Sequence, residues 1–257
     1  VDKDGNIDLE ELKNSICDET ILISIMYANN EIGTIEPIEE IGKIAKEKGI
    51  IFHSDAVQAI GNVKIDVQKS NIDMLSLSGH KFYAPKGVGA LYVREGIRFA
   101  KLQDGGEQEN NKRGGTENVA EIVGLGKAIE LIYSEFDEYN DRLKMLRDYF
   151  LSEVQKNING IKINGDLKNR LPGNANISFE GVDGSELLFK LDELGICASA
   201  GSACSTSNPA PSHVLTAIGL DSKYIDGTLR ITFGRDNKKE DVNYLVNSLK
   251  EIINKIL

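Results

Sequence analysis

The sequence predicts an α/β protein: a large domain with a mainly parallel sheet, residues 1–138, followed by a small α+β domain, residues 139–257. In the first part, apolar runs of strand length alternate with a stretch of helical periodicity, which is typical of a βαβ unit. A long run of helical spacing then extends from Ile122 to Val154. Short apolar runs and a closing apolar stripe follow it, and this order favours a separate α+β domain.

The βαβ unit begins after a short amphipathic helix expected over residues 8–16, where Leu9, Leu12 and Ile16 keep helical spacing. The apolar run from Ile21 to Met26 predicts a buried strand. Isoleucines every three residues, from position 35 to position 44, predict a helix that ends near Gly49, and residues 49–54 predict a second buried strand.

Two more strands extend the predicted sheet. They are expected over residues 73–77 and 88–93, with Pro85 and two glycines in the turn between them. Residues 103–116 are polar and rich in glycine, so we expect a long loop there. The helical stretch after it is one long or kinked helix, or two helices, and the domain boundary is expected near residues 137–141.

The small domain is expected to contain short strands and two principal helices. Asp183 and Glu186 form a plausible capping pair at a helix N-terminus, and Gly195 suits the C-terminal cap of the same helix. The closing helix presents an apolar stripe from Val242 to Ile256. The expected strands are Ile161–Ile163, Ala175–Phe179, Ile196–Ala198 and Thr228–Phe233.

Composition limits the class of protein. The 257 residues include 40 acidic and 30 basic side chains, so the net charge of −10 disfavours nucleic acid or an anionic membrane as the main partner. No apolar run approaches the roughly 20 residues of a transmembrane helix, and no signal peptide is recognisable. A soluble cytoplasmic protein is therefore expected.

The three cysteines form no C-x-x-C pair, so neither a disulfide framework nor a zinc site is indicated, and no metal ligand is assigned. We expect Cys17 and Cys197 to be small buried hydrophobic residues. Cys204 lies in residues 199–209, a stretch with almost no large apolar side chain, which we expect to be mobile and solvent-facing. From composition alone, Cys204 could be an incidental surface thiol or a redox-sensing thiol.

Polar residues that suit one cofactor follow two of the predicted strands. Ser78, His80 and Lys81 come directly after one strand, and Asp55 and Gln58 after another. Open α/β sheets place ligand groups at the carboxyl ends of their strands. Pyridoxal phosphate needs an amine for covalent attachment and an anion for its pyridinium nitrogen, and the lysine and the aspartate supply this pair. Taken alone, the lysine would be read as a surface residue.

The sequence resembles the cysteine desulfurases of the NifS/IscS type, within the class V aminotransferase family. The motifs that carry the resemblance occur in the family's order along nearly the whole chain. They are Asn29–Gly33, His53–Gln58, Ser76–Lys81 with Pro85–Gly87, Arg113–Thr116, Gly201–Cys204 and Leu229–Thr232.

The resemblance implies fold type I of the transferases that use pyridoxal phosphate, with that cofactor bound covalently by Lys81. Thr116 is expected to reach the cofactor phosphate of the other subunit in a homodimer. The cofactor-binding residues implied are Asn30, Asp55, Gln58, Ser78, His80, Lys81 and Thr116.

The resemblance also implies the conversion of L-cysteine to L-alanine. Lys81 moves the α-proton, His80 tunes the cofactor ring, and Asn30 and Arg230 bind the substrate, with the guanidinium holding its carboxylate. Cys204 takes the sulfur as a persulfide and passes it to a scaffold protein of iron-sulfur cluster or thio-cofactor assembly. His53 and His213 are left unassigned.

The chain opens without methionine and looks like the middle of the family's large domain, so part of that domain is expected to be missing. The missing part would include the glycine-rich phosphate-binding turn and a histidine that stacks on the ring. Two alternatives stay open, the first because of the missing segment and the second because related enzymes use the same cofactor. One is a non-catalytic fragment or scaffold, and the other is a related enzyme such as a selenocysteine lyase or an aminotransferase-like lyase.

Overall fold

The computed structural model describes residues 1–200 and 211–256, which divide into two compact units. The parallel-sheet unit comprises Ile16–Tyr27 and Ile38–Phe136, and the α+β unit comprises Val1–Ser15, Ala28–Pro37 and Asp137–Leu257. Residues 1–15 and 28–37 therefore pack with the C-terminal part of the chain. The division into domains at residue 138 stays a prediction, because packing units and domains need not coincide.

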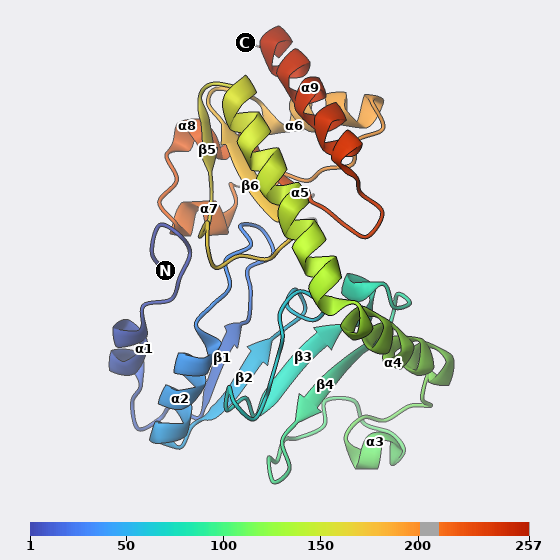
Figure 1. Ribbon diagram of the computed structural model, residues 1–257. Helices are drawn as coiled ribbons and strands as arrows, with labels where there is room; N and C mark the ends of the chain where they lie inside the picture. The colour runs from blue at the N-terminus through green and yellow to red at the C-terminus, as the bar shows by residue number, and fades with distance from the viewer. Residues whose placement is uncertain (201–210, 257) are drawn as a thin grey trace. The chain divides into compact units, whose positions relative to one another are not determined.

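The parallel-sheet unit is built on four strands in the order β1-β2-β3-β4 (Figure 1). The strands β1, β2 and β3 are parallel, and β4 is antiparallel to β3. The prediction of a mainly parallel sheet is thus confirmed. The four strands are β1 (Leu22–Met26), β2 (Ile51–Asp55), β3 (Met74–Ser78) and β4 (Gly89–Val93).

Helix α2 (Ile38–Lys48) supplies the crossover between β1 and β2 and completes the predicted βαβ unit. Its apolar stripe is buried, and the helix ends at Gly49, whose φ of +68° suits a glycine. The prediction that β1 is a buried strand is wrong. Leu22 is 48% exposed and Met26 40% exposed, because β1 lies at the edge of the described sheet and only one of its faces is packed.

The predicted helical stretch after the long loop consists of two helices, α4 (Val119–Ser134) and α5 (Phe136–Asn157), with a break at Glu135. The long loop before them contains one short turn of helix, α3 (Gln108–Asn111), in which Glu109 and Asn110 have left-handed backbone angles. The helix predicted near the start is α1 (Leu9–Ser15), which has no buried residue.

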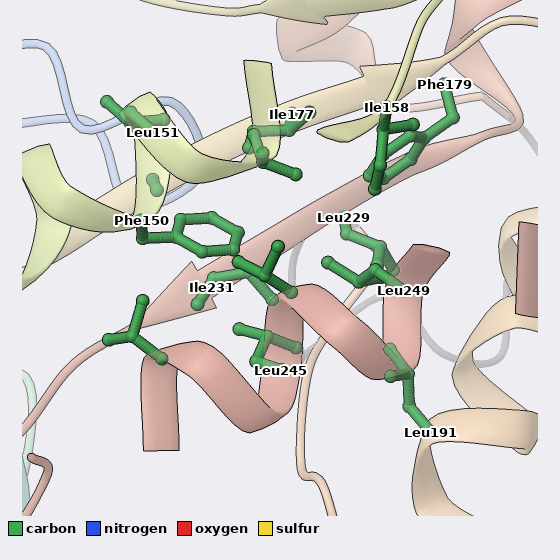
Figure 2. Close-up of a cluster of buried hydrophobic side chains, with 14 of the residues drawn as sticks. Phe150, Leu151, Ile158, Ile177, Phe179, Leu191, Leu229, Ile231, Leu245 and Leu249 are labelled. Atoms are coloured by element: carbon green, nitrogen blue, oxygen red, sulfur yellow. The ribbon is translucent and has the colours of Figure 1, made fainter. Parts of the chain in front are cut away.

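The α+β unit contains an antiparallel sheet of β5 (Ile161–Ile163), β6 (Asn174–Phe179) and β7 (Thr228–Thr232). Polar and apolar residues alternate along both longer strands, so each face of the sheet has one character. The apolar face packs against helices α5, α6 (Gly184–Glu193) and α9 (Lys239–Ile256), and Figure 2 shows part of this core. Burial of this face holds the unit together.

Caps fix the ends of the smaller helices. The carboxylate of Asp183 accepts hydrogen bonds from the N–H groups of Ser185 and Glu186, which confirms the predicted cap of α6. Two further helices, α7 (His213–Ala217) and α8 (Ser222–Ile225), begin after the capping residues Ser212 and Asp221.

The predicted strand over residues 196–198 is absent, and the two cysteines expected in the core are exposed. The N–H of Ile196 donates to the carbonyl of Leu191 at the end of α6, so this stretch continues the helix cap. Cys197 follows it and is exposed for this reason, whereas Cys17 lies in a turn held by Thr20. Both burial predictions are wrong because helix ends and turns lie at the surface.

One buried carboxylate gives the α+β unit a dependence on pH. Glu36 is 6% exposed, and its Oε2 accepts a hydrogen bond from the N–H of Ile7 at 3.0 Å. Burial raises the pKa of Glu36 from 4.5 to about 7. The unfolded chain then loses this proton near pH 4.5 while the folded chain keeps it, so stability falls as the pH rises from 4.5 to 7 and is level above that.

Replacing Glu36 by glutamine removes this titration and keeps an oxygen for the N–H of Ile7. The variant is expected to exceed the wild-type free energy of unfolding by about 1–3 kcal/mol at pH 8, and to match it near pH 4.5. Urea denaturation at the two pH values measures both differences. Equal stability of the two proteins at pH 8 would show that the native carboxylate ionises without cost.

Candidate active site

The carboxyl ends of β2 and β3 carry the residues predicted to hold the cofactor. Asp55 is the last residue of β2, and Ser78 is the last residue of β3. The two strands are parallel, with Asp55 in register with Ser76, so both ends lie at one edge of the sheet. The side chain of Asp55 is exposed, and its carboxylate accepts a hydrogen bond of 2.9 Å from the N–H of Val57, which orients it.

His80 and Lys81 lie in one turn of 3₁₀ helix, η1 (Gly79–Phe82), that begins immediately after β3. Phe82 is 1% exposed and anchors this turn in the core of the parallel-sheet unit, whereas the side chains of His80 and Lys81 are exposed. Tyr83 ends the turn with a φ of +68°, an uncommon conformation for a bulky residue. The lysine is therefore presented by a short, firmly anchored turn.

Ser78 and His80 lie in direct contact, with Oγ and Nδ1 3.0 Å apart. A second polar chain crosses the same sheet, because the ring nitrogens of His53 lie 2.8 Å from Ser24 Oγ and 2.7 Å from Ser76 Oγ. This histidine, left unassigned from sequence, has both nitrogens occupied by hydroxyl groups, which fixes its ring.

The remaining predicted cofactor residues of this unit lie on either side of the strand ends. Gln58 is half-buried three residues beyond Asp55, in the turn that follows β2. Thr116 is exposed at the end of the long loop. The neighbouring Gly115 N–H donates to Gln108 Oε1 at 3.1 Å, and the N–H of Gly114 donates to the carbonyl of Gln103 at 3.0 Å, so the second bond ties the two ends of the loop together.

These residues fit pyridoxal phosphate by their chemistry. The unit offers an amine on an anchored turn, a carboxylate at the adjacent strand end, and hydroxyl, imidazole and amide groups beside them. In the described part of the chain, Lys81 makes no ion pair, so its amine is available for covalent attachment. Residues 1–200 and 211–256 contain no group of three acidic, histidine or cysteine side chains placed to hold a metal ion.

The α+β unit holds the predicted substrate-binding residues on the polar face of its sheet. Arg230 lies on β7 directly across from Asn176 on β6. Its Nη1 donates a hydrogen bond of 3.2 Å to the backbone carbonyl of Asn30, so the structure brings these two predicted residues together. Cys204 lies outside the described residues.

Asn30 belongs to a tight loop, residues 29–34, which we call the Asn30 loop. The side chain of Asn29 closes it by accepting hydrogen bonds from the N–H groups of Glu31 and Ile32. Gly33 has a φ of +80°, and a Cβ there would lie 2.4 Å from Asn174 Oδ1, so only glycine fits.

Sequence reasoning missed the residues that support this loop. Asn174 and Asn176 each donate a side-chain hydrogen bond of 3.2 Å to the carbonyl of Glu31, and Arg170 donates one of 2.9 Å to the carbonyl of Ile32. A signal was present, because β6 alternates polar and apolar residues although all six are buried. Such alternation in a buried strand indicates a second face that binds polar groups.

Comparisons with known proteins agree with this arrangement. The family described as aminotransferase class-V matches residues 1–245. The chain belongs to the class V aminotransferase family. This membership confirms the predicted fold type I and the predicted cofactor, pyridoxal phosphate.

The relatives with high identity within the class V aminotransferases are cysteine desulfurases. The chain is 53% identical over 256 residues to the cysteine desulfurase IscS of Dictyoglomus turgidum and covers 65% of it. It is 54% identical to the cysteine desulfurase IscS of Methanosarcina thermophila and covers 63% of it. A solved NifS-like protein superposes with a TM-score of 0.91 at 37% identity, over 99% of this chain and 67% of that one. The chain thus spans less than two thirds of the curated relatives.

Within residues 1–200 and 211–256, every helix is too short or too polar to cross a lipid bilayer.

Proposed function

We propose that this class V aminotransferase acts as a cysteine desulfurase, which converts L-cysteine to L-alanine and retains the sulfur on Cys204. The observation that carries the proposal is that Asp55 ends β2 and Lys81 lies in the turn directly after the neighbouring parallel strand β3, so an amine and a carboxylate are offered at the same edge of the sheet. The identity of 53% to an IscS desulfurase supports the choice of reaction within the family. The motif Gly201–Cys204 supplies the thiol that a desulfurase needs.

The residues of the parallel-sheet unit serve the removal of the proton from the α-carbon of the substrate. When bound, pyridoxal phosphate supplies a sink for the electron pair left on that carbon. Lys81 would hold the cofactor through its amine, and the same amine would take the α-proton of the substrate and return it to the α-carbon. Asp55 keeps the ring nitrogen protonated, and Ser78, His80 and Gln58 hold the polar edge of the ring.

The residues of the α+β unit bind the substrate and receive the sulfur. The planar guanidinium of Arg230 pairs with the substrate carboxylate, and Asn30 contacts both substrate and cofactor. The Cys204 thiolate attacks the substrate sulfur, so that an S–S bond forms while the Cβ–S bond breaks and the β-carbon takes a proton to give alanine. The outer sulfur of the persulfide then passes to an acceptor protein of iron-sulfur cluster or thio-cofactor assembly in the cytoplasm, and the broken S–S bond leaves Cys204 as the thiolate again.

A homodimer is part of the proposal. Helix α4 is apolar around much of its circumference, and three residues near its start are exposed: Val119 at 65%, Ile122 at 42% and Val123 at 66%. Apolar surface of this kind is typical of an interface between subunits. Thr116 lies just before this helix, so a partner subunit packed on α4 would lie next to this residue, as its proposed contact with the other subunit's cofactor phosphate requires.

A non-catalytic fragment is the second candidate, because the chain covers only 65% of the IscS protein of D. turgidum. A related selenocysteine lyase or aminotransferase-like lyase is the third, and the Gly201–Cys204 motif favours the desulfurase over it. Neither of these lyases requires a protein thiol to receive the sulfur.

The test is the release of sulfide and alanine from L-cysteine by the purified chain with added pyridoxal phosphate and a thiol reductant. We expect equal amounts of the two products from the wild type. In the Cys204→Ser variant, sulfide release should fall to about one tenth or less while cofactor binding is retained. Undiminished release in this variant would favour a lyase, and a wild type without cofactor absorbance would favour the fragment.

A further inference from the structure

The backbone carbonyls of the Asn30 loop supply its first set of attachments. Four consecutive carbonyls accept hydrogen bonds from the α+β unit, and the donors are dispersed along the chain between residues 170 and 230. The carbonyl of Asn30 accepts from Arg230, that of Glu31 from Asn174 and Asn176, that of Ile32 from Arg170, and that of Gly33 from the N–H of Leu171.

The side chain of Glu31 adds a separate attachment. Glu31 is 2% exposed, and its Oε2 accepts a hydrogen bond of 2.6 Å from Ser212 Oγ. The same hydroxyl oxygen accepts from the N–H of Leu215 at 3.3 Å and so caps helix α7. One hydroxyl group therefore joins the loop to a helix that is 181 residues away in sequence.

Packing supports the same junction. Ile32 is 1% exposed and forms a small apolar cluster with Leu215, Ile218 and Leu220 of α7 and the residues that follow it. This apolar cluster already fixes the loop on α7, so packing does not require a buried carboxylate at Glu31. Burial of the Glu31 carboxylate is unfavourable unless hydrogen bonds replace the water that it loses. The buried carboxylate of Glu31 therefore indicates a role in orienting the Asn30 loop.

The orientation of the loop affects that of Arg230. Its Nη1 donates to the carbonyl of Asn30, the residue directly before Glu31. A guanidinium recognises a carboxylate through a planar fork, and its affinity falls when the fork is turned or displaced. A shift of the Asn30 loop therefore moves the carbonyl that aligns Arg230.

We infer that Glu31 and Ser212 are positioning residues, which fix the Asn30 loop on α7 and thereby align Arg230 for the carboxylate of an amino-acid substrate. The inference deepens the proposed function and rests on it. Neither residue touches the substrate. Their effect is on substrate affinity rather than on the chemical step.

The test compares four proteins with added pyridoxal phosphate: wild type, Ser212→Ala, Ser212→Thr and Asp183→Ala. In Ser212→Ala we expect the KM for L-cysteine to rise roughly 10-fold with kcat changed by less than about 2-fold, because a small displacement weakens an oriented contact. Ser212→Thr keeps the hydroxyl and the cap, so its KM should return to that of the wild type. Asp183→Ala removes the cap of α6 in the same unit and controls for a general loss of stability.

Binding of L-alanine, followed by isothermal titration calorimetry, gives a second readout that does not require turnover. Its affinity should fall in Ser212→Ala by the same factor as the KM rises. Unchanged KM and unchanged alanine affinity in Ser212→Ala would overturn the inference and leave the proposed function standing. A wild type that binds L-alanine and releases no sulfide would overturn the proposed function, while the alanine affinities still decide the inference.

Discussion

Lys81→Ala will lose both the visible absorbance of covalently attached pyridoxal phosphate and the release of sulfide from L-cysteine. We expect activity to fall by at least about 10³-fold, because the same amine attaches the cofactor and carries the α-proton. The η1 turn that holds Lys81 is anchored by Phe82, so the substitution should leave the fold intact. Absorbance titration with the cofactor and a sulfide assay measure the two losses.

A matched control for this change is Lys43→Ala, which removes an exposed lysine from α2 in the same unit. It should bind the cofactor and release sulfide within about 2-fold of the wild type, since surface substitutions are usually near neutral. If Lys81→Ala kept the absorbance of the attached cofactor, another amine would be the attachment point.

Phe150→Ala is expected to lower the free energy of unfolding by about 3–5 kcal/mol. Phe150 is fully buried in the core of the α+β unit (Figure 2). Its ring packs edge-on against that of Phe233, with the centroids 5.7 Å apart. The truncation leaves a cavity between α5, β7 and α9 that the rigid sheet cannot close. Denaturation in guanidinium chloride measures the loss.

Phe189→Ala supplies the comparison, because Phe189 lies on α6 in the same unit and is 60% exposed. Its removal should change the free energy of unfolding by less than about 0.5 kcal/mol. Equal losses in the two variants would mean that the buried aromatic pair contributes no more than a surface ring.

Local pattern was sufficient to predict most of the fold. The βαβ unit, the crossover helix α2 and the capped helix α6 follow from periodicity and from residues such as Gly49 and Asp183 that mark helix ends. Apart from the absent strand over residues 196–198, the predictions that failed concern burial. The edge position of β1 and the exposure of Cys197 depend on which neighbours are present, and hydrophobicity alone does not encode this.

The candidate site also contains residues that could be predicted from the sequence and residues that could not. Asp55 and Lys81 could be predicted because each follows a strand, and the edge of a parallel sheet gathers such residues. The support of the Asn30 loop could not be predicted, because Glu31 and Ser212 are 181 residues apart and no local pattern links the two positions. Only the alternation of polar residues in β6 indicated that its second face binds polar groups.

The long separation of these partners also determines when the Asn30 loop is able to form during synthesis. Asn30 precedes Arg230 by 200 residues, so at a translation rate of roughly 5–20 residues per second the ribosome needs about 10–40 s to make the last donor after the first acceptor. Throughout that interval the loop carbonyls are hydrated, and Ile32 is without the apolar cluster that later buries it. The four strands described in the parallel-sheet unit, by contrast, are all made by Val93 and can begin to pair long before the α+β unit is complete. Slower elongation therefore prolongs the exposure of the Asn30 loop to chaperones and proteases more than that of the sheet.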